Sequence, residues 1–218
     1  MLNKNIRILI IMGHGGKDSG AVYGKLVESR MNVICATAMA DFLLYNGFNV
    51  TLEPNNGDVN YEQKLAQGYD LVISIHFNSG GGDGFESFCN PSNKETVAIC
   101  KAIEKRVQAF GQNSRGIKSG IGYKMVSGIN PSAIILEGGF IDNPKDSQLF
   151  DEEHEQKALG KSYALGVMDY FGVTPRTESS KKGYRVVTGF YTDKNNAIKE
   201  QERLKTKGID SFLVYTEV

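Results

Sequence analysis

Short apolar runs and longer segments of helical periodicity alternate along the chain as far as Phe171. Runs rich in β-branched residues predict strands, and apolar positions spaced three and four residues apart predict helices. The expected strands are Ile6–Met12, Phe48–Glu53, Asp70–His76, Gly84–Cys89, Tyr123–Val126 and Ala133–Glu137. The expected helices are Ser29–Asn46, Lys94–Phe110 and Glu153–Phe171. This alternation predicts an α/β fold with a mainly parallel sheet that helices cover on both faces.

The pattern changes after residue 173. Residues 174–183 are polar, contain Pro and Gly and lack periodicity, so we interpret them as a linker. The remaining residues, 184–218, predict a small βαβ unit, with a strand at Tyr184–Phe190, a helix at Asp193–Lys207 and a strand at Phe212–Tyr215. We therefore expect a main domain at 1–173 and a small C-terminal unit joined by this linker.

Composition and charge remove several classes of function. The 218 residues include 25 basic and 25 acidic side chains, so no net charge attracts the chain to nucleic acid. No apolar run approaches the roughly 18 residues of a membrane span, so we expect no membrane insertion. The apolar N-terminal run is too short for a signal peptide, which predicts a protein made in the cytoplasm. Three cysteines without a CxxC spacing predict reduced, buried thiols.

Four side chains with metal-binding or acid–base chemistry stand next to the predicted strands. His14 follows the first strand in a Gly-rich loop, His76 ends the third strand, Glu28 precedes a helix and Glu137 ends the last strand of the domain. Because parallel strands end at one edge of a sheet, where ligands bind, we expect these residues to meet there. Two His and one Glu are a common ligand set for catalytic zinc. From the residues alone, a buried structural histidine and an ordinary ion pair at Glu137 remain alternatives.

The motifs around these residues resemble those of the zinc-dependent N-acetylmuramoyl-L-alanine amidases, which include bacterial autolysins and phage endolysins. They occur in the family's order, as Gly13-His14-Gly15-Gly16-Lys17-Asp18-Ser19-Gly20-Ala21, Glu28 with Asn32, Ser74-Ile75-His76-Phe77-Asn78-Ser79 and Glu137-Gly138-Gly139-Phe140-Ile141-Asp142-Asn143. The resemblance implies one zinc ion held by His14, Glu28 and His76, with Glu137 as the catalytic carboxylate. It also implies a six-stranded mixed sheet flanked by helices.

The chain departs from the family's usual pattern at three places. Ile11-Met12 replace an Asp-Pro pair before the Gly-rich loop, Ser29 replaces a Lys, and Leu52-Glu53 replace a Thr-Arg pair. None of these departures removes an implied ligand. They therefore bear on the choice of substrate more than on activity.

The resemblance implies a peptidoglycan hydrolase. Zinc-activated water would cleave the amide between N-acetylmuramic acid and L-alanine, and Glu137 would carry the proton to the leaving amine. Asn78 and Glu86 lie near the same edge and are candidates for substrate binding. The alternative is a non-catalytic peptidoglycan-binding protein, for which the complete ligand set with Glu137 would have no use. Without a signal peptide, such an enzyme would reach the wall after holin release from a phage-infected cell, or after mother-cell lysis in sporulation.

The C-terminal unit resembles half of a sporulation-related peptidoglycan-binding module. Tyr184-Arg185-Val186-Val187-Thr188-Gly189-Phe190-Tyr191 matches its opening strand, and Lys207-Gly208-Ile209-Asp210-Ser211 matches its turn from helix to strand. Two strands and one helix bury too little surface to fold alone. We therefore expect residues 184–218 of two chains to pair in a homodimer, with docking on the chain's own main domain as the alternative.

Overall fold

The structure is a computed structural model and describes residues 5–53, 57–129, 132–176 and 193–209. The chain divides into two compact units, Met1–Pro175 and Arg176–Val218. Among the described residues, no helix combines the length and hydropathy needed to cross a membrane.

The first unit is built on a six-stranded mixed sheet in the order β4-β1-β5-β8-β6-β7. The strands are β1 (Arg7–Met12), β4 (Asn49–Leu52), β5 (Leu71–Asn78), β6 (Phe85–Cys89), β7 (Ser114–Ser119) and β8 (Ser132–Phe140). Strands β4, β1, β5 and β8 are parallel. Strand β6 pairs antiparallel with β8, and β7 runs parallel to β6. The predicted α/β class, with a mainly parallel sheet flanked by helices, is confirmed.

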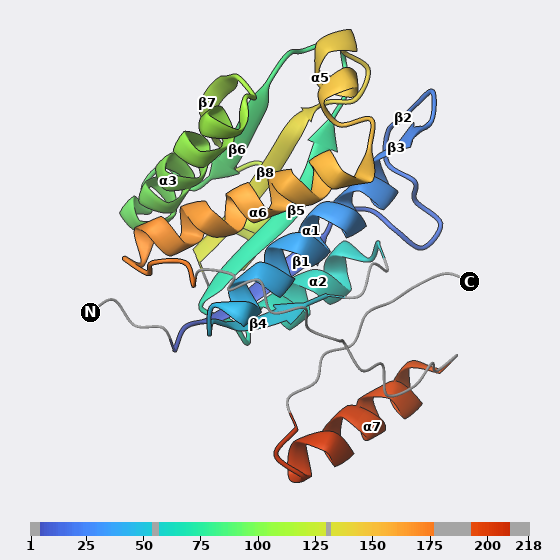
Figure 1. Cartoon of the computed structure of the whole chain (residues 1–218), viewed down its shortest axis with the longest axis vertical. Helices are drawn as coiled ribbons and strands as arrows, with labels where there is room; N and C mark the ends of the chain where they lie inside the picture. Colours follow the sequence, from blue (N-terminus) through green and yellow to red (C-terminus); the bar gives the residue numbers. More distant parts are fainter. Residues whose placement is uncertain (1–4, 54–56, 130–131, 177–192, 210–218) are drawn as a thin grey trace. The chain divides into compact units, whose positions relative to one another are not determined.

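Three long helices lie side by side on one face of the sheet, and α6 packs between the other two (Figure 1). They are α1 (Glu28–Tyr45), α3 (Lys94–Phe110) and α6 (Glu153–Tyr170). Their buried apolar side chains join strand residues such as Ile8, Ile10 and Ile73 in the larger core. Gly160 of α6 permits the close approach of α1, because a Cβ there would collide with the carbonyl oxygen of Cys35.

Two short helices, α2 (Val59–Ala66) and α4 (Lys124–Ser127), cover part of the opposite face. Leu9, Ile11 and Val72 belong to the smaller core on this side. Because alternate strand residues point to opposite faces, Ser74 and His76 share the face of Val72. Apolar side chains therefore give way to polar ones towards the carboxyl end of β5.

The strand predicted at Tyr123–Val126 is wrong. The carbonyl of Tyr123 accepts hydrogen bonds from the backbone N–H groups of Val126 and Ser127, which begins the short helix α4. Met125 and Val126 pack into the smaller core from outside the sheet. The sixth strand is instead β7 at the sheet edge, whose polar sequence, Ser-Arg-Gly-Ile-Lys-Ser, lacks the apolar pattern of a buried strand.

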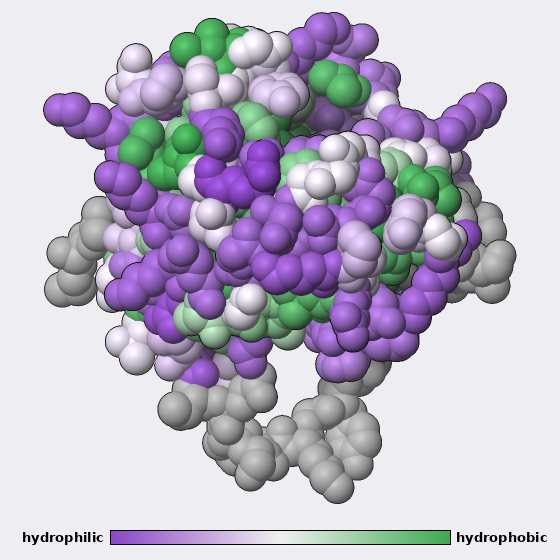
Figure 2. Space-filling view, turned by 90° about the horizontal axis from the view of Figure 1, so that it is seen from above, coloured by the Kyte–Doolittle hydropathy of each residue, from purple (hydrophilic) through white to green (hydrophobic). Residues whose placement is uncertain are grey.

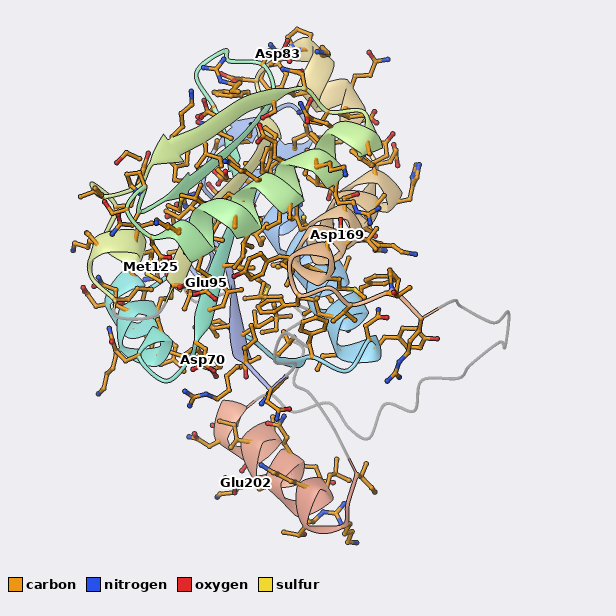
Figure 3. All side chains as sticks on the ribbon, turned by 90° about the vertical axis from the view of Figure 1, so that its left-hand side faces the viewer. Asp70, Asp83, Glu95, Met125, Asp169 and Glu202 are labelled. Atoms are coloured by element: carbon orange, nitrogen blue, oxygen red, sulfur yellow. The ribbon has the colours of Figure 1, made fainter. Side chains whose placement is uncertain are left out.

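The reversal of β6 and β7 places two kinds of strand end at one rim of the sheet. The carboxyl ends of β1, β5 and β8 lie there with the first residues of β6 and β7. Asp70 precedes β5 and Asp83 precedes β6, and they lie at opposite ends of the sheet (Figure 3). The hairpin β2 (Val22–Tyr23) and β3 (Leu26–Val27) and the helix α5 (Pro144–Leu149) complete this unit.

The described part of the second unit contains the helix α7 (Lys194–Thr206). The Asp193 carboxylate accepts a hydrogen bond from the backbone N–H of Asn196 and caps the helix N-terminus. The helix predicted at Asp193–Lys207 is therefore confirmed in this unit, where Leu204 is buried. The two strands predicted at Tyr184–Phe190 and Phe212–Tyr215 lie outside the described residues.

Candidate active site

His14 stands at the start of the Gly-rich loop, where its backbone adopts φ 61°. Among the described residues it is the one non-glycine residue with positive φ, and such conformations concentrate at functional sites. Its Nδ1 lies 2.8 Å from Asp18 Oδ2 and its Nε2 lies 3.0 Å from Glu28 Oε1. The loop therefore holds the imidazole between two carboxylates.

Glu28 is the first residue of α1, and its side chain is 5% exposed. Its Oε2 accepts the backbone N–H of Ala21 and its Oε1 accepts that of Phe77. Burial raises the pKa of Glu28, but hydrogen bonds to His14 and His76 outweigh burial and lower the pKa well below its ordinary value. The carboxylate is therefore ionised and fixed in place.

His76 is near the end of β5, with Nδ1 3.1 Å from Glu28 Oε1 and Nε2 3.1 Å from Ser74 Oγ. Its ring passes directly over Gly13, where a Cβ would collide with the ring atoms. At Gly20, with φ +62°, a Cβ would lie 2.6 Å from Glu28 Oε2. These glycines leave the space in which the three side chains meet.

His14, Glu28 and His76 each offer a ligand atom, and these atoms all lie within 4.8 Å of one another. Two imidazoles with one carboxylate suit zinc and leave coordination positions for water or substrate. Asp18 and Ser74 contact the ring nitrogens that face away from Glu28, as outer partners of metal-binding histidines do. The donor set therefore fits a zinc ion.

Without metal, the hydrogen bond to Glu28 raises the pKa of His14 to about 9, and Asp18 adds to this effect while burial opposes it. The imidazole then holds a proton at neutral pH. A metal that takes the same nitrogen must displace that proton, so metal binding and proton release are coupled.

Glu137 is in register with His76 on the neighbouring strand β8. Its Oε2 is buried and has no hydrogen-bond partner among the described residues. Burial and, to a smaller extent, the carboxylates of Glu28 and Glu86 together raise the pKa of Glu137 to about 7, while the imidazoles of His76 and His14 oppose this rise. A carboxyl group with this pKa can take up and return a proton at neutral pH.

The structure also brings the two predicted substrate-binding residues to this rim. Glu86, near the start of β6, is in register with Glu137 and is 8% exposed. Its Oε2 accepts a hydrogen bond from Asn78 Nδ2 at 3.3 Å, and its Oε1 accepts one from Arg115 Nε at 2.7 Å. All six residues singled out from the sequence therefore come to one rim of the sheet.

Sequence reasoning passed over several residues of this rim. Arg115 was missed because its strand, β7, was not recognised. Glu62 of α2 is buried near the two imidazoles. Burial raises the pKa of Glu62, and the charges of His76 and His14 oppose this rise. Asn32, by contrast, was recognised from the sequence as part of the motif with Glu28, and its Nδ2 donates to the carbonyl of Gly13.

The surface at this end of the molecule is mainly hydrophilic, with separate hydrophobic patches between the polar side chains (Figure 2). Such a surface suits a polar polymer better than an apolar ligand. A two-histidine, one-carboxylate cluster at the rim of an α/β sheet, with a protonatable glutamate beside it, is an arrangement typical of metallohydrolases.

Comparison with known proteins identifies the family. Residues 8–169 match the family described as N-acetylmuramoyl-L-alanine amidase, so the chain belongs to it. Residues 155–215 match the SPOR domain. This second match begins within α6, where Leu159, Tyr163 and Val167 are completely buried in the first unit. The two matches therefore overlap on a helix that is part of the amidase fold.

Individual relatives agree with this assignment. The sporulation-specific N-acetylmuramoyl-L-alanine amidase of Bacillus subtilis is 30% identical over 96% of this chain and 84% of its own length. The N-acetylmuramoyl-L-alanine amidase CwlM of Bacillus licheniformis is 26% identical over 97% of this chain and 86% of its own length. Among solved structures, the catalytic domain of CwlV from Paenibacillus polymyxa superposes with a TM-score of 0.70. It is 26% identical and covers 78% of this chain and 99% of its own.

Proposed function

We propose that this chain is a zinc-dependent amidase that cleaves the bond between N-acetylmuramic acid and L-alanine in peptidoglycan and so lyses the cell wall. His14, Glu28 and His76 would hold the zinc ion. The observation that carries the proposal is the convergence of these ligand atoms within 4.8 Å beside Glu137. Bound there, zinc would act as a Lewis acid towards the scissile carbonyl and the attacking water.

Glu137 would supply the acid–base chemistry. Its pKa of about 7 allows the carboxylate to accept a proton from water and the carboxyl group to return it to the leaving amine of L-alanine. The buried Oε2, which lacks a partner among the described residues, is free to receive that proton. Asp18 and Ser74 would hold the two imidazoles in orientation.

The decisive experiment measures new amino groups and new reducing ends in purified cell walls treated with the full chain. An amidase releases amino groups without reducing ends, whereas a glycosidase releases reducing ends and a non-catalytic binder releases neither. Chelation should abolish release and added zinc should restore it. Full activity after verified metal removal would contradict the zinc assignment.

Replacing Glu137 separates catalysis from metal binding. Glu137→Gln should retain zinc and lose about 10²- to 10⁴-fold in activity, because it removes the proton carrier and leaves the ligands intact. Glu153→Gln, on the exposed surface of α6, is the matched control and should keep full activity. Wild-type rates in Glu137→Gln would overturn its role.

The C-terminal unit completes the proposal. We assign residues 1–173 to catalysis, 174–183 to a linker and 184–218 to peptidoglycan binding, supported by the SPOR match. Two copies of 184–218 would pair in a homodimer, and a sedimentation mass of one chain at micromolar concentration would contradict this pairing. The name of the Bacillus subtilis relative favours sporulation, with action on the wall after mother-cell lysis, over holin-dependent phage lysis.

A further inference from the structure

A row of charged side chains crosses four neighbouring strands at the rim, on the face that carries the metal-ligand cluster. His76 of β5 is in register with Glu137 of β8, which is in register with Glu86 of β6. The register of β6 and β7 shifts at this point, so Glu86 faces Arg115 of β7 across a bulge. Gly116, with φ +81°, supplies the backbone conformation of that bulge. Arg115 therefore stands at the opposite end of the row from the metal ligands.

The guanidinium group of Arg115 is held in one orientation. Its Nε donates to Glu86 Oε1 at 2.7 Å, and its Cζ lies 5.2 Å from the ring centroid of Phe140. This distance is within the range of a cation–π contact. The Phe140 ring is packed against Gly82, where a Cβ would collide with it. The arginine is therefore positioned before any substrate arrives.

The terminal nitrogens of the same guanidinium group are available to a ligand. The Arg115 side chain is 42% exposed, and among the described residues neither terminal nitrogen has a hydrogen-bond partner. Nearby acids have partners of their own. Asp83 pairs with Lys145, and Asp146 accepts backbone N–H groups. The two terminal nitrogens of an arginine form a planar fork that matches a carboxylate.

We propose that Arg115 binds a carboxylate of the stem peptide, on the residue that follows L-alanine, and so selects the substrate. This inference rests on the proposed function, because it takes Glu137 as the group beside the scissile amide. The backbones of Glu137 and Arg115 are two strand spacings apart, about 10 Å. Two residues of extended peptide span about 7 Å, and the arginine side chain covers the remainder.

The test compares two soluble muropeptides that differ only in the residue after L-alanine, which carries either a free carboxylate or the corresponding carboxamide. The wild-type chain, loaded with zinc, should cleave the free carboxylate with a kcat/KM at least about tenfold higher, because charge-assisted hydrogen bonds are the stronger ones. Arg115→Gln should lower kcat/KM for that substrate about tenfold or more and leave the carboxamide within about twofold. Arg115→Lys, which keeps the charge, should retain part of the preference.

The control is Arg106→Gln, which breaks a similar arginine–carboxylate pair with Asp169 on the helical face of the domain. It should leave both rates unchanged. Zinc content and thermal unfolding of every variant are measured alongside to verify folding. Equal wild-type rates on both substrates, or an equal loss on both in Arg115→Gln, would overturn the inference. Cleavage of neither substrate by the wild type would instead overturn the proposed function.

Discussion

Two buried carboxylates lie at the same rim of the sheet and have different partners. Glu28 accepts the backbone N–H groups of Ala21 and Phe77 and also contacts two imidazoles. Asp146 accepts the backbone N–H groups of Gly84 and Phe140 and the side-chain amide of Gln112. The two residues are similarly buried, since Glu28 is 4% exposed and Asp146 is 0% exposed. Burial alone therefore does not reveal which carboxylate performs chemistry.

The chemistry of the partners separates the two sites. Backbone and amide groups cannot exchange a proton at neutral pH or bind a transition metal well, so the Asp146 cluster can only hold the loop before β6 against the end of β8. Imidazoles can do both, so the Glu28 cluster can hold a metal ion. A series of carboxylate-to-amide substitutions tests this distinction, since each removes a charge with little change in shape.

Glu28→Gln should show the largest effect. The amide is a poor metal ligand, so we expect zinc affinity and wall hydrolysis each to fall by more than about a hundredfold, beyond the loss typical of an outer-shell partner. The unfolding free energy of the metal-free protein should also fall, by about 1–3 kcal/mol, because the amide nitrogen cannot accept one of the two backbone N–H groups that the carboxylate oxygens accept. Competition with a chromophoric chelator and urea unfolding measure the two quantities. Retained zinc affinity would contradict the assignment of Glu28.

Asp146→Asn should lower stability without affecting zinc binding. Its amide nitrogen would face a hydrogen-bond donor, so a charge-assisted bond is lost in a fully buried place. We expect the unfolding free energy to fall by about 1–3 kcal/mol. Zinc affinity should stay within about twofold. Loss of zinc from a folded Asp146→Asn protein would show that the two clusters are not separate.

Asp18→Asn should have an intermediate effect, confined to the metal. Its carboxylate contacts Nδ1 of His14 at 2.8 Å and is largely exposed. Replacing a carboxylate in this position usually costs about tenfold to a hundredfold in metal affinity. Competition with a chelator should detect this loss of zinc affinity, and urea unfolding should show no change in the free energy of unfolding. A drop in stability without a change in zinc affinity would assign Asp18 to bracing the loop.

The sequence revealed the side of the rim with the histidines better than the opposite side, for a physical reason. His14 follows a buried parallel strand, and His76 and Glu137 lie near the ends of two others. The apolar runs of these strands are easy to recognise, and their carboxyl ends meet at one edge. Arg115 belongs to an exposed edge strand with a polar sequence and a bulge, so no apolar pattern marks it. The role of Asp146 depends on how a loop closes over β8, and neither periodicity nor a motif encodes that closure.

Glu86 was placed at this edge from the sequence, but the parallel-strand pattern does not account for its position. Its place at the rim arises because β6 runs antiparallel to β8, so the start of this strand meets the ends of the others. An all-parallel reading of the pattern would put Glu86 at the opposite end. The apolar residues of Tyr123–Val126 predict a strand that does not form, because a single helical turn can bury two adjacent apolar side chains as well as a strand can.

Asp70→Asn should have the smallest effect of the series. Asp70 lies at the end of the sheet away from the site (Figure 3) and pairs with Arg7, with both side chains about half exposed. Arg7 lowers the pKa of Asp70 below its ordinary value of 3.8, so its contribution to stability is present at neutral pH and is lost as the pH falls through that lowered pKa. Solvent and salt screen the pair, and we expect a loss below about 1 kcal/mol at neutral pH. Urea unfolding of both proteins at neutral pH and in acid measures the difference, which should vanish in acid. A loss as large as that of Asp146→Asn would show that exposure does not separate weak carboxylate pairs from strong ones in this fold.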